Sequence, residues 1–212
     1  MRDQNTTPPA IEGLLREHPL LWRGRPDPRP RSGLPTGFPA LDTALPDGGW
    51  PTRGVVELLH EGPGLGQVSL LLPLAARLAA DGLGVVWLNP PPAPYAPALA
   101  AAGLPLARCL WLQPETRRDQ FWAAERVVRS AACGLLLWWP PVLAPTTLRR
   151  LQLAASDGAT LAVLLVHRPL DGNHVPLRLR LRRLDNGERE LRVLRARGSH
   201  RRPLVRLSLI HI

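Results

Sequence analysis

Residues Val55–Leu72 read VVELLHEGPGLGQVSLLL, which is an apolar run, a glycine-rich turn and a second apolar run. This layout is typical of a strand, a phosphate-binding loop and a helix. In such loops backbone N–H groups cradle phosphate, a Lys reaches the β- and γ-phosphates, and a Ser or Thr holds Mg²⁺. Here Gly66 is followed by Gln67 and Val68, and Glu61 stands where the first glycine is required. The sequence predicts a loop that keeps the scaffold of a nucleotide site without its chemistry.

The chain contains no lysine, so all 27 basic residues are arginines and no lysine from elsewhere can serve the loop. We therefore expect no catalytic residues, no cofactor and no bound metal. We call the segment from Glu61 to Val68 the vestigial loop. Its candidate residues are Glu61, Gly62, Gly64, Gly66, Gln67 and Val68.

The composition limits the kinds of partner, metal site and membrane segment that we expect. The formal net charge of +10 favours a nucleic acid or an acidic partner. The two cysteines, Cys109 and Cys133, have no metal-binding spacing. The apolar run near Leu135–Trp139 is far too short to span a bilayer, and the N-terminus has no signal-peptide pattern. We expect a soluble cytoplasmic protein with no membrane partner.

Strand-like runs alternate with helix-like segments along the central part of the chain. This alternation predicts an α/β fold with a mostly parallel, doubly wound sheet flanked by helices. The expected strands are 55–59, 84–88, 109–112, 134–139 and 160–166. The expected helices are 38–45, 68–80, 98–102, 117–132 and 146–156, the last capped by Thr146 or Thr147.

The C-terminal region predicts a β-hairpin with one basic face. Leucines and arginines alternate from residue 177 to 182, and Asp185-Asn186-Gly187 forms a turn before residues 190–197. No aromatic residue is interleaved, which argues against base stacking. The alternative to a contact surface is an ordinary solvated strand face. The candidate DNA or partner contacts are Arg178, Arg180, Arg182 and Arg192.

The N-terminal region predicts a short helix over Ile11–Trp22, followed by a basic, proline-rich linker to Gly33. Such an arm can dock in the groove of a partner. Folding back onto its own domain is the alternative. The candidate partner-binding anchors are Leu14, Leu15, Leu21 and Trp22.

These patterns divide the chain into four parts. Residues 1–33 form the arm and linker, 34–170 the core, and 171–206 the basic hairpin region. The last part, 207–212, reads LSLIHI and matches a translated sequencing adapter, so we expect a non-native tail.

The opening of the core resembles the RecA-type pattern T-G-x-x-x-L-D-x-x-L-x-x-G-G-x-P-x-G-x-x-x-E. The matching residues are Thr36, Gly37, Leu41, Asp42, Leu45, Gly48, Gly49, Pro51, Gly54 and Glu57. The resemblance runs to about Arg168 and implies a RecA-like core. It also implies that the active-site positions have been replaced: Asn89 for the water-activating Glu, Trp138 and Trp139 for the Walker B acid, and His167 or Arg168 at the switch position. Because phosphoryl transfer needs these groups together, hydrolysis by an unorthodox loop is disfavoured.

Together with HPLLWRGR at His18–Arg25, this core resembles the ImuA family. The resemblance implies a non-catalytic adaptor of the bacterial mutasome in SOS-induced translesion DNA synthesis, active at the nucleoid after DNA damage. Its partners would be the recombinase RecA, ImuB and, through ImuB, the error-prone DNA polymerase III α subunit. SulA-type proteins share the degenerate core. The alternative is therefore a cell-division inhibitor that binds the tubulin-like division protein.

Overall fold

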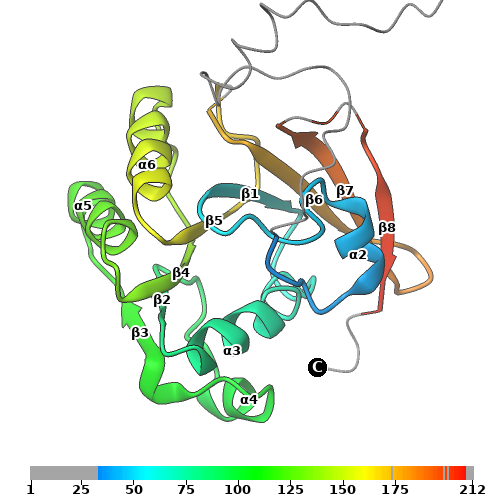
Figure 1. The fold of residues 1–212 in the computed structure, drawn as a ribbon, viewed down its shortest axis with the longest axis horizontal. Helices are drawn as coiled ribbons and strands as arrows, with labels where there is room; N and C mark the ends of the chain where they lie inside the picture. The colour runs from blue at the N-terminus through cyan, green and yellow to red at the C-terminus, as the bar shows by residue number, and fades with distance from the viewer. Residues whose placement is uncertain (1–32, 173, 198, 200, 209–212) are drawn as a thin grey trace, which may run out of the picture. The chain divides into compact units, whose positions relative to one another are not determined.

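Eight strands form one sheet in the computed structural model, which describes residues 33–172, 174–197, 199 and 201–208. The strands lie in the order β3-β2-β4-β5-β1-β6-β7-β8 (Figure 1). Neighbours from β3 to β6 are parallel, whereas β7 and β8 run antiparallel. The bounds are β1 Gly54–His60, β2 Gly84–Leu88, β3 Cys109–Leu112, β4 Cys133–Trp138, β5 Leu161–Val166, β6 Leu177–Arg183, β7 Arg189–Ala196 and β8 Leu204–Leu207.

Helices cover both faces of the sheet, as expected for a doubly wound fold. Figure 1 shows α5 and α6 on one face and α2, α3 and α4 on the other. Two separate apolar clusters, one on each face, form the core. The helices are α2 Pro39–Ala44, α3 Leu72–Ala80, α4 Ala96–Ala101, α5 Arg117–Val128 and α6 Pro145–Asp157, with a 3₁₀ turn at Leu106–Arg108.

The central strands are buried on both faces. Every residue of β1, β4 and β5 is buried, which explains why β4 and β5 read as continuous apolar runs. In β1, Val56 and Leu58 pack on the α3 side, while Val55 and Leu59 pack on the side of α5 and α6. The predicted mixed α/β class with a mostly parallel sheet is confirmed.

The predicted C-terminal hairpin is formed by β6 and β7 and belongs to the same sheet as the core. β6 pairs in parallel with β1, with Glu57 opposite Arg178 and Leu59 opposite Arg180. Leu177, Leu179 and Leu181 are buried on the side of α3, so the alternating arginines occupy the other face. The hairpin region therefore extends the sheet of residues 34–170 directly.

Several helix boundaries differ from the prediction, and the helix expected at 98–102 is α4, Ala96–Ala101. α3 begins at Leu72 rather than Val68, with a proline in its first turn where the missing N–H is tolerated. α6 begins at Pro145 with Ala144 as its N-cap, so the predicted cap at Thr146 or Thr147 is wrong. α5 ends at Val128, because the chain must turn at 130–132 to enter β4.

Strand β8 was not predicted. Its Val205 and Leu207 are buried, and Leu207 pairs with Arg189, although Leu207 falls in the segment expected to be a non-native tail. The origin of residues 207–212 and the four-part division of the chain stay predictions. The predicted helix Ile11–Trp22 lies outside the described residues. Among the described residues, no helix is long and apolar enough to cross a membrane.

Candidate functional site

The vestigial loop leaves the carboxyl end of β1, where a parallel sheet normally places its ligand site. Gly64 and Gly66 have positive φ angles of 73° and 87°, so glycine supplies the backbone conformation of the turn. The α-helix then starts six residues after Gly66, at Leu72. In between, the N–H groups of Leu70 and Leu72 donate to the carbonyls of Gly66 and Val68. These two N–H groups form hydrogen bonds within the chain and are not available to bind an anion.

Gln67 stands at the position of the phosphate-binding lysine and is buried, with 7% of its surface exposed. Its Oε1 atom has no hydrogen-bond partner among the described residues. Val68 packs partly against the apolar cluster on the α3 side. The two residues thus belong to the interior of the protein and present no cation to the loop.

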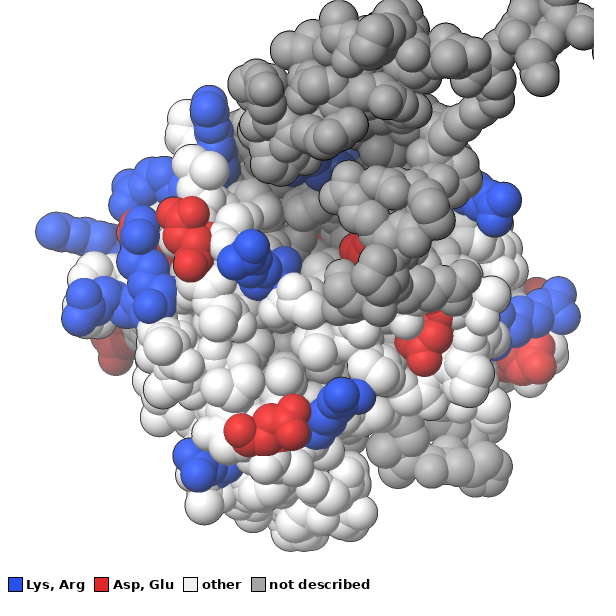
Figure 2. All heavy atoms as spheres, viewed as in Figure 1, with Lys and Arg blue, Asp and Glu red and all other residues white. Residues whose placement is uncertain are grey.

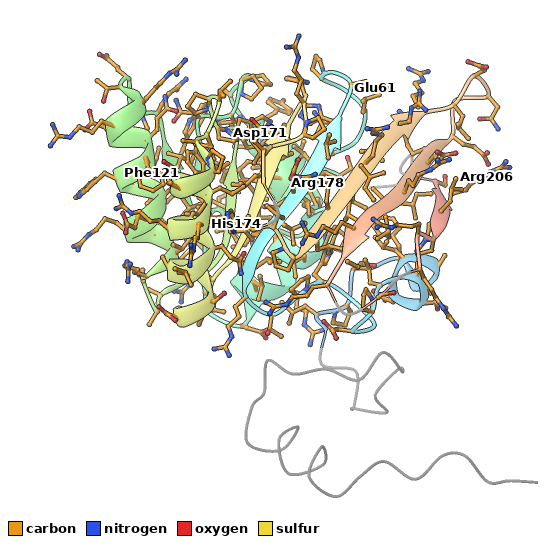
Figure 3. All side chains as sticks on the ribbon, turned by 90° about the horizontal axis from the view of Figure 1, so that it is seen from above. Glu61, Phe121, Asp171, His174, Arg178 and Arg206 are labelled. Atoms are coloured by element: carbon orange, nitrogen blue, oxygen red, sulfur yellow. The ribbon has the colours of Figure 1, made fainter. Side chains whose placement is uncertain are left out.

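Two arginines of the hairpin hold the vestigial loop. The Nε atom of Arg182, on β6, lies 2.8 Å from the carboxylate of Glu61. The Nε atom of Arg189, on β7, donates to the carbonyl of Leu65 at 2.7 Å, and its guanidinium also donates to the carbonyl of Gly187. Figure 3 labels Glu61 at the end of β1, where the loop begins. Glu61, which adds an unfavourable charge for phosphate, is thereby part of the tie between loop and hairpin.

A buried ion pair lies between β1 and β6, further from the vestigial loop. Glu57 of β1 is completely buried and accepts from the Nε atom of Arg178 at 2.7 Å and from the backbone N–H of Leu170 at 2.9 Å. Arg178 also donates to the carbonyl of Leu170 at 2.7 Å. Burial raises the pKa of Glu57, while the Leu170 N–H and Arg178 oppose that rise. Arg178, a candidate contact residue, is thus engaged inside the fold (Figure 3).

Two histidines lie beside the vestigial loop: His60 is the last residue of β1, and His167 directly follows β5. The rings of His60 and His167 lie 4.4 Å apart, and His167 Nδ1 donates to the carbonyl of His60 at 3.1 Å. His60 Nδ1 donates to the carbonyl of Gly62 at 2.9 Å, and burial lowers the pKa of His60. His60 lies inside the fold, because only 2% of it is exposed. No group of three metal-ligating side chains occurs among the described residues.

Asn89, Trp138 and Trp139, the other residues at predicted active-site positions, form contacts within the protein. Asn89 has a positive φ angle of 49° and donates to the carbonyl of Pro114 at 3.2 Å. Trp139 packs on the α3 side and stacks on Trp87, with ring centroids 6.2 Å apart. Trp138 is buried in the other cluster, with α5 and α6. Of the two tryptophans, only Trp139 therefore packs on the α3 side.

The other candidate arginines lie on the face of the hairpin opposite α3. Arg180 stands directly opposite Arg192 in the β6–β7 register, which places like charges side by side. Arg192 is paired weakly with Glu190 at 3.5 Å. Figure 2 shows that basic side chains also gather over α5 and α6, so positive charge is not confined to the hairpin. Leu14, Leu15, Leu21 and Trp22 lie outside the described residues.

Sequence reasoning found the vestigial loop but missed the network of Glu57, Leu170 and Arg178. A glutamate inside an otherwise apolar strand was the available signal, because an isolated carboxylate is costly to bury. Its partner lies 121 residues further along the chain, and only the pairing of β1 with β6 brings it close. The arrangement supplies internal contacts and no reactive group.

Parts of this chain are similar to known proteins. No family model matches the chain. The cell division inhibitor SulA of Edwardsiella piscicida is 28% identical over 116 residues, which span 54% of this chain and 69% of that protein. The crystal structure of SulA from Pseudomonas aeruginosa is 22% identical, with a TM-score of 0.43 over 52% of this chain and 98% of that chain. The sequence match supports likeness to SulA better than a specific relation to the ImuA family.

Proposed function

We propose that this chain is a non-catalytic, SulA-like protein that inhibits cell division by binding the tubulin-like division protein. The observation that carries the proposal is the 28% identity to a cell division inhibitor over 116 residues. That protein is matched over 69% of its length, so the similarity covers most of one relative and about half of this chain. The proposed site of action is the cytoplasm.

The geometry of the vestigial loop supports a binding function over an enzymatic one. Phosphoryl transfer depends on a positioned cation and on Mg²⁺ to neutralise developing charge. Gln67 replaces the lysine and is buried, and the N–H groups of Leu70 and Leu72 donate to carbonyls of the same segment. Arg182 and Arg189 tie the loop to the hairpin through Glu61 and Leu65. Purified protein should show no Mg²⁺-dependent ATP turnover above that of a mock preparation.

We also propose that the core derives from a RecA-like domain. Its opening residues, Thr36 to Glu57, lead directly into the central strand and the vestigial loop. Thr36 donates its N–H to the Asp42 side chain at 2.8 Å, and Glu57 anchors the buried network. The opening motif thus serves the fold of this chain even though nucleotide chemistry is absent.

Overexpression in a rod-shaped bacterium tests the inhibitor function directly. Cells should grow into long filaments without septa, and the purified protein should suppress GTP-dependent polymerisation of the division protein in light scattering. An Arg178→Met variant, which is expected to be destabilised, should have a weaker effect in both assays. Normal septation at protein levels confirmed by blotting, with unaffected polymerisation, would refute the inhibitor function.

The second candidate is the mutasome adaptor, which is favoured by the resemblance of His18–Arg25 to the ImuA family. In that case immobilised protein should capture RecA or ImuB without added ATP, and cells should divide normally on overexpression. Substituting Leu14→Asp and Leu15→Asp should abolish capture if the arm docks in a partner, with Leu204→Asp as an exposed-leucine control. Capture that survives the arm substitutions would place the interface elsewhere.

Direct DNA contact is the weakest part of the adaptor candidate. Arg182 and Arg192 are half-exposed and each is paired with a glutamate, while Arg178 is internal. Binding through Arg180, Arg182 and Arg192 should weaken steeply with salt, because phosphate contacts release counterions. Fluorescence anisotropy with a labelled single strand at two salt concentrations measures this. Equal anisotropy with and without protein at low salt would remove DNA from the partners.

A further inference from the structure

Strand β3 forms one end of the sheet and pairs with β2 alone among the described strands. Its sequence, Cys-Leu-Trp-Leu, contains no charged residue and no proline. Leu110 is 51% exposed and Trp111 is 42% exposed. Exposed edges of natural sheets are normally protected by charges, prolines or bulges, because their free backbone groups template pairing with another chain. This edge lacks these devices.

The opposite end of the sheet shows what protection looks like in the same chain. β8 carries Arg206, and Arg201, Arg202 and Pro203 come directly before it. The charge of Arg206 inside the strand disfavours addition of a further strand there. The two ends of the described sheet therefore differ, because β8 carries a charge within the strand and β3 carries none.

Backbone geometry shows which groups of β3 face outward. The carbonyl of Leu112 accepts from the N–H of Asn89, at the end of β2, at 2.9 Å. Since the backbone groups of successive strand residues alternate between the two sides, the N–H and C=O of Trp111 are directed away from β2. Trp111 stands beside Trp87 in the register, so its ring continues the apolar surface of the sheet toward the edge. The outward groups of Trp111 can form a hydrogen-bonded pair with another strand.

We propose that β3 pairs in antiparallel orientation with β3 of a second copy of this chain, around a two-fold axis at Trp111. Arg108 precedes the strand and Glu115 follows it, and both are exposed. Antiparallel pairing brings the basic end of one strand near the acidic end of the other, whereas parallel pairing brings like charges together. The two-fold arrangement closes after two copies, and each Leu110 then lies opposite Leu112 of the second copy.

The expected dimer is weak and depends on concentration. A four-residue strand with two exposed apolar side chains offers less area than a stable interface requires. The hydrogen bonds of the strand pair and the adjacent Trp111 rings supply the association. The inference rests on the β3 edge alone and is independent of the proposed function.

Sedimentation velocity of the full chain across the micromolar range tests the proposal. The weight-average mass should rise from that of a monomer toward that of a dimer. Trp111→Pro removes both the outward N–H and the ring at the proposed axis, at a position where an edge strand tolerates proline, and Trp111→Lys places a charge at the axis from both copies. Both variants should stay monomeric while their circular dichroism is unchanged. Leu153→Lys, at a 56% exposed leucine on α6, is the matched control and should dimerise normally.

Crosslinking gives a second readout that does not depend on the Trp111 variants folding. With the axis at Trp111, Gln113 lies opposite Cys109 of the second copy. Gln113→Cys should therefore give a covalent dimer with a short bifunctional thiol reagent, while Cys133 is buried and unreactive. Monomeric protein at all concentrations, or a dimer that persists in both Trp111 variants, would overturn the proposal. A Gln113→Cys protein that yields no more crosslinked dimer than the unsubstituted chain would do the same.

Discussion

Strands β1 and β6 are joined by two glutamate–arginine pairs, one in the middle of the sheet and one at the vestigial loop. The Glu57–Arg178 pair spans 2.7 Å and the Glu61–Arg182 pair 2.8 Å. Glu57 is fully buried and Arg178 is 18% exposed, whereas Glu61 and Arg182 are 55% and 51% exposed. The two pairs have similar distances but different free energies of interaction, because water competes for the exposed Glu61–Arg182 pair much more than for the buried Glu57–Arg178 pair.

The difference has a consequence for function. The inner pair fixes the register of the hairpin on the core and cannot be spared for a partner. Breaking the outer pair costs little free energy, so the carboxylate of a partner can replace that of Glu61 on Arg182. The exposed end of the hairpin is thus the part of the basic face that remains adaptable.

The largest expected effect follows from removing the inner arginine. Arg178→Met leaves the buried carboxylate of Glu57 without its cation and should lower the free energy of unfolding by about 3–5 kcal/mol. Urea denaturation followed by circular dichroism measures this. The matched change Arg182→Met, in the same strand, should have a far smaller effect. Similar losses for the two variants would contradict the distinction by burial.

The second-largest expected effect is that the stability lost in the Arg178→Met variant depends on pH. Burial raises the pKa of Glu57, so the folded state binds its proton more readily than the unfolded state does. The stability contributed by protonated Glu57 is present below the ordinary carboxyl pKa and is lost as pH rises through the folded pKa. Removing Arg178 raises that pKa further.

The Arg178→Met variant should therefore lose less stability at about pH 5 than at about pH 8, because Glu57 can enter the core protonated at the lower pH. Urea titrations at both pH values measure the difference. In the double variant with Glu57→Gln the pH dependence of the Arg178→Met loss should disappear. If the loss of stability grew on acidification, a group other than Glu57 would be responsible for the pH dependence.

A smaller effect is expected at the loop itself. Arg189→Ala removes the donor to the Leu65 carbonyl, a charge-assisted hydrogen bond that is partly buried. The free energy of unfolding should fall by about 1–2 kcal/mol. Hydrogen exchange should accelerate at Gly64 to Gly66 more than in β1. Uniform acceleration across the sheet would show that Arg189 supports the whole hairpin instead of the loop.

The smallest effect belongs to the outer pair. A double-mutant cycle with Glu61→Gln and Arg182→Met should give a coupling free energy of at most about 1 kcal/mol, as exposed pairs do. The coupling should vanish near 1 M salt, where the screening length is about 3 Å. The same cycle on Glu57 and Arg178 should keep most of its coupling in salt. Salt-resistant coupling at Glu61 would mean that the loop end is shielded from water.

Much of the fold could be predicted from local patterns. Gly84–Leu88 and Cys109–Leu112 form the strands expected for them, because short apolar runs between turn signals have few alternatives. The start of α3 could not be predicted from the apolar run Val68–Leu72, since both a helix and buried turns accommodate such residues. β8 was missed because Leu204–Leu207 is short and reveals its alternation only once it pairs with β7.

The sequence by itself determined that the vestigial loop has no lysine, hydroxyl or metal ligand where nucleotide chemistry needs them, and that strands alternate with helices. These conclusions depend on residue type and local order, which the chain states directly. The tertiary structure alone decided that Arg178 neutralises Glu57, that His60 is buried against His167, and that β3 is the last of the described strands at one end of the sheet. Each of these depends on strand order and register, which are set by the packing of the whole sheet and by no single segment.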